Sequence, residues 1–335
     1  MSNTRQDAGS PHPDPRTSPT PSPVTPTAPP AAPPTAPAHR VRTATASTDA
    51  TTDAVPGATT GATTGVTSDV TTGATAGAAD SAATGVVTGV VRHEPAAPTR
   101  AQTLAPGARI DAHRHDEHQI AYAGTGVVAV TTDAGTWFAP GTRAIWVPAG
   151  TVHAHRAYGR LDLHLVGLPA DDNPLGPDVP TVLAVSPLLR ELIRAYTAAP
   201  GDTGAERRRL RAVLRDQLRA SPQQPLRLPA ASDPRLASVC SLLDADPADP
   251  RTLADLGAAT NTSARTLSRL FRAEFGMTFP QWRTQVRLYH ALRMLADGAP
   301  VTAVAHRCGW SSPSAFIDVF RRAFGSTPGA HHRAP

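Results

Sequence analysis

Residues 267–276 of this 335-residue chain read LSRLFRAEFG, and residues 316–325 read FIDVFRRAFG. The two stretches are offset by 49 residues and share the pair Phe-Arg, at Phe271 and Phe320, as well as the closing pair Phe-Gly. Apolar residues recur in both at intervals of three and four, which indicates an amphipathic helix. The match therefore predicts one helical unit that the chain uses twice.

Each stretch also carries the signals that begin and end a helix. Ser263 and Ser312 are suited to the N-terminal cap, because a serine oxygen accepts hydrogen bonds from the first free backbone N–H groups. Gly276 and Gly325 are suited to the C-terminal end, because glycine adopts the left-handed conformation at little cost. We therefore predict a helix between each serine and its glycine.

A short helix is predicted before each of these, at 253–260 and 301–308. The residues between, 261–262 and 309–310, contain asparagine and glycine, which tolerate the positive φ of a tight turn. Residues 280–296 lack a helix breaker after the first position and should form one continuous helix that connects the two units. The result is two helix-turn-helix units, the motif that places its second helix in a DNA groove.

Polar side chains gather on the face of each second helix that lies opposite its apolar stripe. Arginine can pair with two acceptors of guanine, so we expect Arg265 and Arg269 to read bases; phosphate contact or plain solvation is the alternative. Arg272 lies farther along its helix and should hold phosphate, and Asp318 either accepts from cytosine or discourages wrong sequences. The complete set of candidate DNA contacts is Arg265, Ser268, Arg269, Arg272, Ser312, Ser314, Asp318, Arg321 and Arg322.

Residues 233–333 resemble the AraC/XylS family of bacterial regulators. The resemblance is carried by LSRLFRAEFG at 267–276 and by AHRCGWSSPSAF at 305–316. It implies that the two exposed helix faces enter successive major grooves on one side of DNA. Gly257 and Thr262 depart from the family pattern, which usually has alanine and a larger apolar residue there, and this departure predicts a looser first unit.

Basic charge is concentrated in the same region. The chain has a net charge of +5 and contains no lysine, and residues 251–335 hold 11 arginines against 4 acidic residues, an excess of 7. An end that meets a polyanion is expected to have this charge, although a solvated basic surface without a partner would have it too.

Residues 93–168 have a different pattern, with short alternating apolar runs separated by glycine and proline, which predicts a small all-β domain. Within it, PGARIDAHRHDEHQ at 106–119 and GTRAIWVPAGTVH at 141–153 resemble the two motifs of the cupin barrel. That barrel is the ligand-sensing module often found ahead of this kind of DNA-binding domain. The resemblance implies a sensor for a small-molecule effector.

The candidate effector pocket consists of residues from these two motifs: His113, His115, His118, Gln119 and His153. The resemblance to metal-binding cupins makes His113, His115 and His153 candidate metal ligands, with Gln119 where a carboxylate is usual. His113 and His115 point to the same face if they lie on one strand. Two interpretations stay open: a site for a divalent metal, or a metal-free pocket whose histidines hydrogen-bond an organic effector or each other.

The predicted organisation is multidomain. Residues 1–92 form a disordered tail rich in proline, alanine and threonine, 93–168 a small cupin-like barrel, 169–228 a helical linker, and 229–335 an all-α DNA-binding domain. The linker carries dimer contacts, passes the state of the barrel to the DNA-binding domain, or packs against its own barrel. The sequence contains neither a signal peptide nor an apolar run long enough to span a membrane, and its two cysteines, Cys240 and Cys308, predict no disulfide framework. We therefore expect the cytoplasm.

These features predict a transcription regulator that binds double-stranded DNA and responds to a small-molecule or metal effector. The alternative is a cupin metalloenzyme fused to a DNA-binding domain, but no second acid or base is identifiable beside the histidines, so we expect no enzyme activity. RNA polymerase and a second copy of the chain are further partners compatible with this layout, and activation and repression both fit it.

Overall fold

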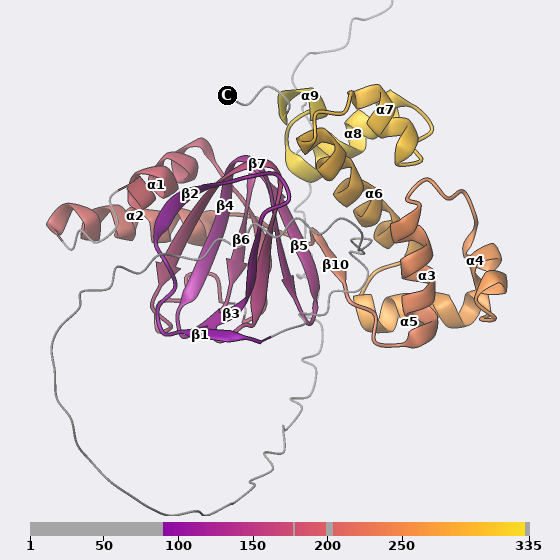
Figure 1. The fold of residues 1–335 in the computed structure, drawn as a ribbon, viewed down its shortest axis with the longest axis horizontal. Helices are drawn as coiled ribbons and strands as arrows, with labels where there is room; N and C mark the ends of the chain where they lie inside the picture. Colours follow the sequence, from indigo (N-terminus) through magenta and orange to yellow (C-terminus); the bar gives the residue numbers. More distant parts are fainter. Residues whose placement is uncertain (1–89, 177, 199–203, 332–335) are drawn as a thin grey trace, which may run out of the picture. The chain divides into compact units, whose positions relative to one another are not determined.

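The computed structural model describes residues 90–176, 178–198 and 204–331, so the predicted disordered tail at 1–92 lies almost entirely outside the described residues. The described part begins with a β-rich region and ends in a series of short helices (Figure 1). This order confirms the predicted fold class. In the described part of the chain, no helix combines the length and the hydrophobicity that crossing a membrane requires.

The β-rich region, which we name the β-domain, is one ten-stranded sheet within the described residues. Two long strands, β4 and β7, pair with each other and each binds further strands, and the only parallel pair described is β1 with β3. The path through the sheet is β1-β3-β7-β4-β6-β8-β9, with β2 on β7, β5 on β4 and β10 on β5. The first seven strands are β1 (Arg92–Glu94), β2 (Arg100–Leu104), β3 (Arg109–His115), β4 (His118–Thr132), β5 (Gly135–Pro140), β6 (Arg143–Val147) and β7 (His153–Leu168).

The two faces of the sheet belong to different apolar clusters. Ala121 and Ala123 of β4 lie in the main core, whereas Ile120 and Tyr122 between them lie in a second cluster beneath α1 (Pro187–Ala198) and α2 (Ala205–Ala220). Successive residues of a strand point to opposite faces, so at the start of β4 Ala121 and Ala123 define an inner face and Ile120 and Tyr122 an outer face.

The segment predicted as a helical linker, 169–228, contains both expected helices but also strands. β8 (Thr181–Ala184) pairs with β6, β9 (Gln223–Gln224) pairs with β8, and β10 (Arg227–Pro229) pairs with β5. The prediction of a purely helical linker is therefore wrong in part. Its strands are two to four residues long, too short to leave a period in the sequence.

The helical region, which we name the helical domain, contains the predicted pairs, the predicted connecting helix and two additional helices, one at its start and one at its end. Both serine caps and both glycine ends are confirmed: the Ser263 and Ser312 oxygens accept from the backbone N–H groups of Thr266 and Ala315, and Gly276 and Gly325 have φ of 68° and 77°. The helices are α3 (Pro234–Ala245), α4 (Leu253–Ala259), α5 (Ala264–Phe275), α6 (Phe279–Ala296), α7 (Val301–Arg307), α8 (Pro313–Phe324) and α9 (Pro328–His331).

The turn between α4 and α5 corrects the expectation of a looser first unit. Asn261 has a φ of 51°, as a tight turn requires, and the Thr262 N–H donates to the Gly257 carbonyl oxygen at 2.8 Å. A Cβ atom at position 257 would lie 2.3 Å from the Thr262 carbonyl oxygen. Glycine therefore permits a close approach of two backbone segments, and the unit is tighter than alanine would allow.

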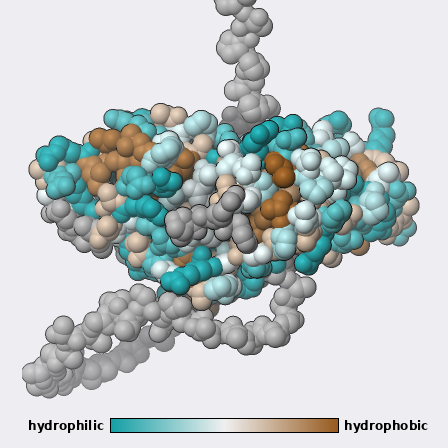
Figure 2. All heavy atoms as spheres, turned by 90° about the horizontal axis from the view of Figure 1, so that it is seen from above, coloured by the Kyte–Doolittle hydropathy of each residue, from teal (hydrophilic) through white to brown (hydrophobic). Residues whose placement is uncertain are grey.

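Aromatic side chains fill the interior of the helical domain. Phe271 of α5 contacts Trp282 of α6, and Phe316, Phe320 and Phe324 of α8 are fully buried. Burial of each such side chain is worth about 1.5–3 kcal/mol, so the repeated phenylalanines anchor α5 and α8 from one side. On the face shown in Figure 2, hydrophobic surface is confined to patches between hydrophilic ones.

Candidate functional site

The second helix of the first unit, α5, exposes the polar face that was predicted from the sequence. Arg265, Arg269 and Arg272 are exposed, whereas Leu267 and Phe271 on the other side are completely buried. Nη1 of Arg272 donates to the Ser268 hydroxyl at 3.3 Å. The structure thus brings all four predicted polar residues of α5 to one surface.

The second unit presents a matching face on α8. Ser314, Asp318, Arg321 and Arg322 are exposed, and Nη2 of Arg321 donates to Oδ1 of Asp318 at 3.3 Å. Ser312 differs from the others, because its hydroxyl oxygen caps the helix. The Ser312 side chain is therefore engaged at the helix N-terminus and does not lie free on the exposed face.

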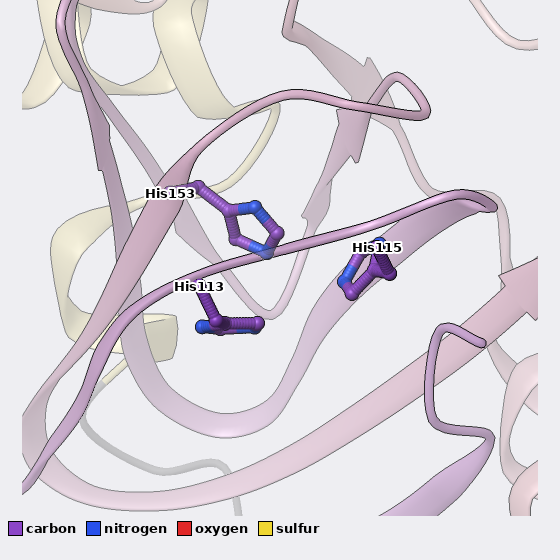
Figure 3. Close-up of side chains that lie close together, drawn as sticks. All are labelled: His113, His115 and His153. Atoms are coloured by element: carbon purple, nitrogen blue, oxygen red, sulfur yellow. The ribbon is translucent and has the colours of Figure 1, made fainter. Parts of the chain in front are cut away.

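Three histidines of the β-domain converge on its inner face (Figure 3). His113 of β3 is the direct register partner of His153 of β7, and His115 lies two residues after His113. One nitrogen from each ring falls within 4.8 Å of the other two, and all three side chains are buried. These are the three residues predicted to be metal ligands.

The backbone fixes the proton position on each of these rings. Nδ1 of His113 contacts the Asp111 carbonyl at 2.8 Å, Nδ1 of His115 the Glu117 carbonyl at 3.0 Å, and Nδ1 of His153 the Thr151 carbonyl at 2.9 Å. A carbonyl only accepts, so each Nδ1 carries the hydrogen and each Nε2 keeps a free lone pair. Each of the three rings therefore keeps one nitrogen lone pair that can bind a ligand.

Burial keeps these imidazoles neutral. It lowers the pKa of His113 and His115, and it lowers the pKa of His153 to about 3, with the neighbouring rings adding to the effect on His153. Metal ions bind the neutral form of histidine, so the proton does not compete strongly for these nitrogens at neutral pH.

Gln119 of β4 joins the group from a third strand. Its side-chain oxygen lies 3.3 Å from Nε2 of His153, and its amide nitrogen is buried without a hydrogen-bond partner among the described residues. Gln119 therefore lies beside the nitrogen of His153 that keeps a free lone pair.

His118, in contrast, lies apart from the predicted pocket. It neighbours Gln119 on β4 and therefore faces the outer side, where its ring stacks on Trp146 at 4.7 Å. Nδ1 accepts from the Ala149 N–H at 2.9 Å and Nε2 donates to the Ala170 carbonyl at 3.0 Å. Both ring nitrogens are hydrogen-bonded to the backbone, so neither is free to bind a ligand.

His155, which was not predicted as a pocket residue, lies in the pocket, whereas the predicted His118 does not. It lies two residues after His153 on β7 and so shares the inner face, with ring centroids 5.0 Å from His153 and 5.6 Å from His113. Burial lowers its pKa well below the ordinary value. The signal that reveals it is the spacing His-X-His at 153–155, which repeats the spacing at 113–115.

The residues present fit a divalent transition metal. Three neutral imidazoles with fixed tautomers are a common ligand set for zinc, iron and related ions, and a backbone carbonyl on the second nitrogen is the usual outer partner. Nε2 of His115 supports this fit, because it is buried and has no hydrogen-bond partner among the described residues. His113, His115 and His153 would hold the ion.

Comparison with known proteins matches both parts of the chain. A helix-turn-helix family model matches residues 256–334, and a model described as an AraC-like ligand binding domain matches residues 99–214. The HTH-type transcriptional regulator NimR of Escherichia coli is 34% identical over 224 residues, which cover 65% of this chain and 81% of NimR. The HTH-type transcriptional regulator RipA of Corynebacterium glutamicum is 35% identical over 101 residues, 30% of each chain.

Among solved structures, the DNA-binding domain of AdpA in complex with a target DNA is 36% identical to the matched part of this chain. The match covers 31% of this chain and 93% of that domain, with a TM-score of 0.28. The relatives named here are all described as regulators of transcription.

Proposed function

The chain belongs to the AraC family of DNA-binding transcription regulators. We propose that α5 and α8 read its operator while a ligand in the β-domain controls the binding. One observation carries the proposal: each of two helix-turn-helix units leaves one polar helix face exposed and buries the opposite face. Two such faces suit two successive major grooves.

We assign roles within these faces by position along the helix. Arg265 and Arg269 lie in the first half of α5, where a recognition helix meets base edges, and each guanidinium suits a guanine. Arg272, Arg321 and Arg322 lie in the last turns and suit phosphates, which set the register. Ser314 and Asp318 are the remaining candidates for base edges on α8.

The effector pocket in this proposal consists of His113, His115, His153 and Gln119 on the inner face, with His155 beside them. A divalent ion held by the three histidines would supply a Lewis acid that attracts an electron-rich group of the effector. The support comes from the convergence of three nitrogens within 4.8 Å in a buried site.

A route from this pocket to the helical domain runs along β7. The described residues all fall within one compact unit. Tyr158 follows His155 by three residues, and its hydroxyl lies 2.5 Å from the hydroxyl of Tyr289 on α6, the helix that connects the two reading units. A shift of β7 on ligand binding would therefore reach α6 directly.

The proposal extends to two protein partners. A regulator of transcription acts on RNA polymerase, and a second copy of the chain would allow two operator half-sites to be bound together. Leu188 of α1 and Val213 of α2 are exposed apolar side chains on the outer helices, which suit such a contact.

Selection of binding sites from random DNA tests the central proposal. The full-length chain should enrich one sequence, and the double variant Arg265→Ala/Arg269→Ala should lose the part of that sequence read by α5. Arg219→Ala, at an exposed arginine of α2, is the matched control and should leave the preference unchanged. If the wild-type chain enriched no sequence at low salt, the proposal would fail.

A further inference from the structure

His155 is a buried polar side chain that makes no hydrogen bond with the described residues. Its side chain is only 2% exposed, and neither ring nitrogen has a hydrogen-bond partner among the described residues. A buried polar atom left without a hydrogen bond costs about 1–3 kcal/mol. The other buried histidines outside the group of three contrast with it, since both nitrogens of His118 and of His164 are hydrogen-bonded.

A second unpartnered donor lies on the same inner face. The amide nitrogen of Gln119 is buried without a hydrogen bond, although the side-chain oxygen contacts His153. The ring N–H of a neutral His155 and the NH₂ group of Gln119 are therefore two donors that have no acceptor within hydrogen-bonding distance among the described residues. Two donors without acceptors indicate a ligand that carries electron-rich atoms.

The absence of charge on the three candidate metal ligands also favours an electron-rich ligand. The ligand set His113, His115 and His153 is neutral, and Gln119 supplies an amide where a carboxylate would supply a charge. The carboxylate of Glu117 is used by the Ala97 N–H at 3.0 Å, and that of Glu94 lies 3.8 Å from Arg92. None of the three ligands would therefore cancel the charge of a divalent ion in this pocket, and a buried charge needs compensation.

We propose that the pocket binds an anionic small molecule between the divalent metal held by His113, His115 and His153 and the N–H donors of His155 and Gln119. This inference rests on the proposed effector site and names the chemical class of its ligand: a monoanion such as a carboxylate. In this arrangement the metal accepts one electron-rich atom of the anion, and His155 donates a hydrogen bond to it.

The test uses full-length protein loaded with Co²⁺, whose visible absorption reports its ligands, and azide as the probe anion. Wild-type protein should bind about one Co²⁺ per chain through its three histidines, and azide should change the spectrum in a saturable way. His155→Phe, which keeps a planar ring without nitrogen, should retain the Co²⁺ and raise the dissociation constant for azide about tenfold or more, the loss of one charge-assisted hydrogen bond. His155→Gln, which keeps an N–H donor, should recover part of the affinity.

His164→Gln is the matched control, because His164 is a buried histidine of the same strand whose nitrogens contact Thr197 and Asp162. It should bind Co²⁺ and azide as the wild type does. If His155→Phe does not fold, judged by circular dichroism, Gln119→Leu replaces it and should weaken azide binding in the same way.

Three results would overturn the proposal: wild-type protein that binds no Co²⁺, a cobalt spectrum that azide leaves unchanged, or a folded His155→Phe protein that binds azide as tightly as the wild type. Loss of Co²⁺ from folded His155→Phe would equally contradict it, since His155 would then be a metal ligand. Sequence-specific DNA binding of the same preparations, measured by gel shift, tests the regulator proposal separately.

Discussion

Replacing Arg269 with alanine should separate base reading from general attraction to DNA. Arg269 is exposed on α5, and no hydrogen bond or ion pair holds its side chain among the described residues. Its removal should therefore change the free energy of unfolding by no more than about 0.5 kcal/mol. Any larger effect on DNA binding then belongs to the interface.

The size of that effect follows from the geometry of the contact. A bidentate pair between arginine and guanine contributes about 1–3 kcal/mol of discrimination, which corresponds to about a 5- to 140-fold increase in the dissociation constant for the preferred site. Discrimination should relax at one or two adjacent base pairs and stay intact at the others, because in the proposed arrangement α8 meets a different groove.

Arg272 supplies the control on the same helix. It lies about one turn farther from the N-terminus and contacts Ser268, so its guanidinium is expected at the DNA backbone. Arg272→Ala should weaken all sequences alike and reduce the slope of log affinity against log salt by about one. Arg269→Ala should also change the sequence preference.

Binding-site selection on the three proteins, followed by fluorescence anisotropy at one fixed salt concentration, measures both quantities. An unchanged sequence preference for Arg269→Ala would show that this face does not read bases. The reasoning would fail equally if Arg272→Ala altered the preference as much as Arg269→Ala did.

Three further predictions concern folding and domain organisation. Residues 229–335 alone should bind the selected site, with affinity falling as salt rises by a slope of about −0.9 per neutralised phosphate; a folded fragment without DNA binding at low salt would contradict the domain assignment. In metal-free protein, stability should fall as pH drops below the ordinary histidine pKa of 6.5 toward the pKa of His153, about 3, because the unfolded chain takes up protons that the buried rings do not. Each such histidine adds up to about 1.4 kcal/mol per pH unit, so an unchanged melting temperature between pH 7 and pH 5 would refute the burial argument. Gly257→Ala should cost about 1–3 kcal/mol, since its Cβ would lie 2.3 Å from the Thr262 carbonyl oxygen, whereas Gly329→Ala, whose Cβ meets nothing within 4 Å, should be neutral by thermal melting.

The helical domain was predictable from sequence because its signals are local. Helix caps, glycine ends and apolar spacing act over fewer than a dozen residues, and the repeat at 267–276 and 316–325 states them twice. The bounds of α5 and α8 and the exposure of Arg265, Arg269 and Arg321 follow from these signals alone. The roles of these arginines on DNA stay predictions.

The close backbone contact at Gly257 could not be predicted from the sequence. The sequence showed that Gly257 departs from the family pattern, but only the structure shows the Thr262 carbonyl that fills the space of a side chain there. Such a contact depends on the angle between two helices, which apolar spacing does not define.

The residues of the pocket were predictable from the sequence only in part. Sequence placed His113 and His115 on one face of a strand, since alternation is a local property. It did not place His155 with them or separate His118 from Gln119, because that requires the bounds of β4 and β7 and the register that sets His113 opposite His153. Register joins segments about forty residues apart through backbone hydrogen bonds that any sequence can make, so only the tertiary structure decided which histidines share the inner face.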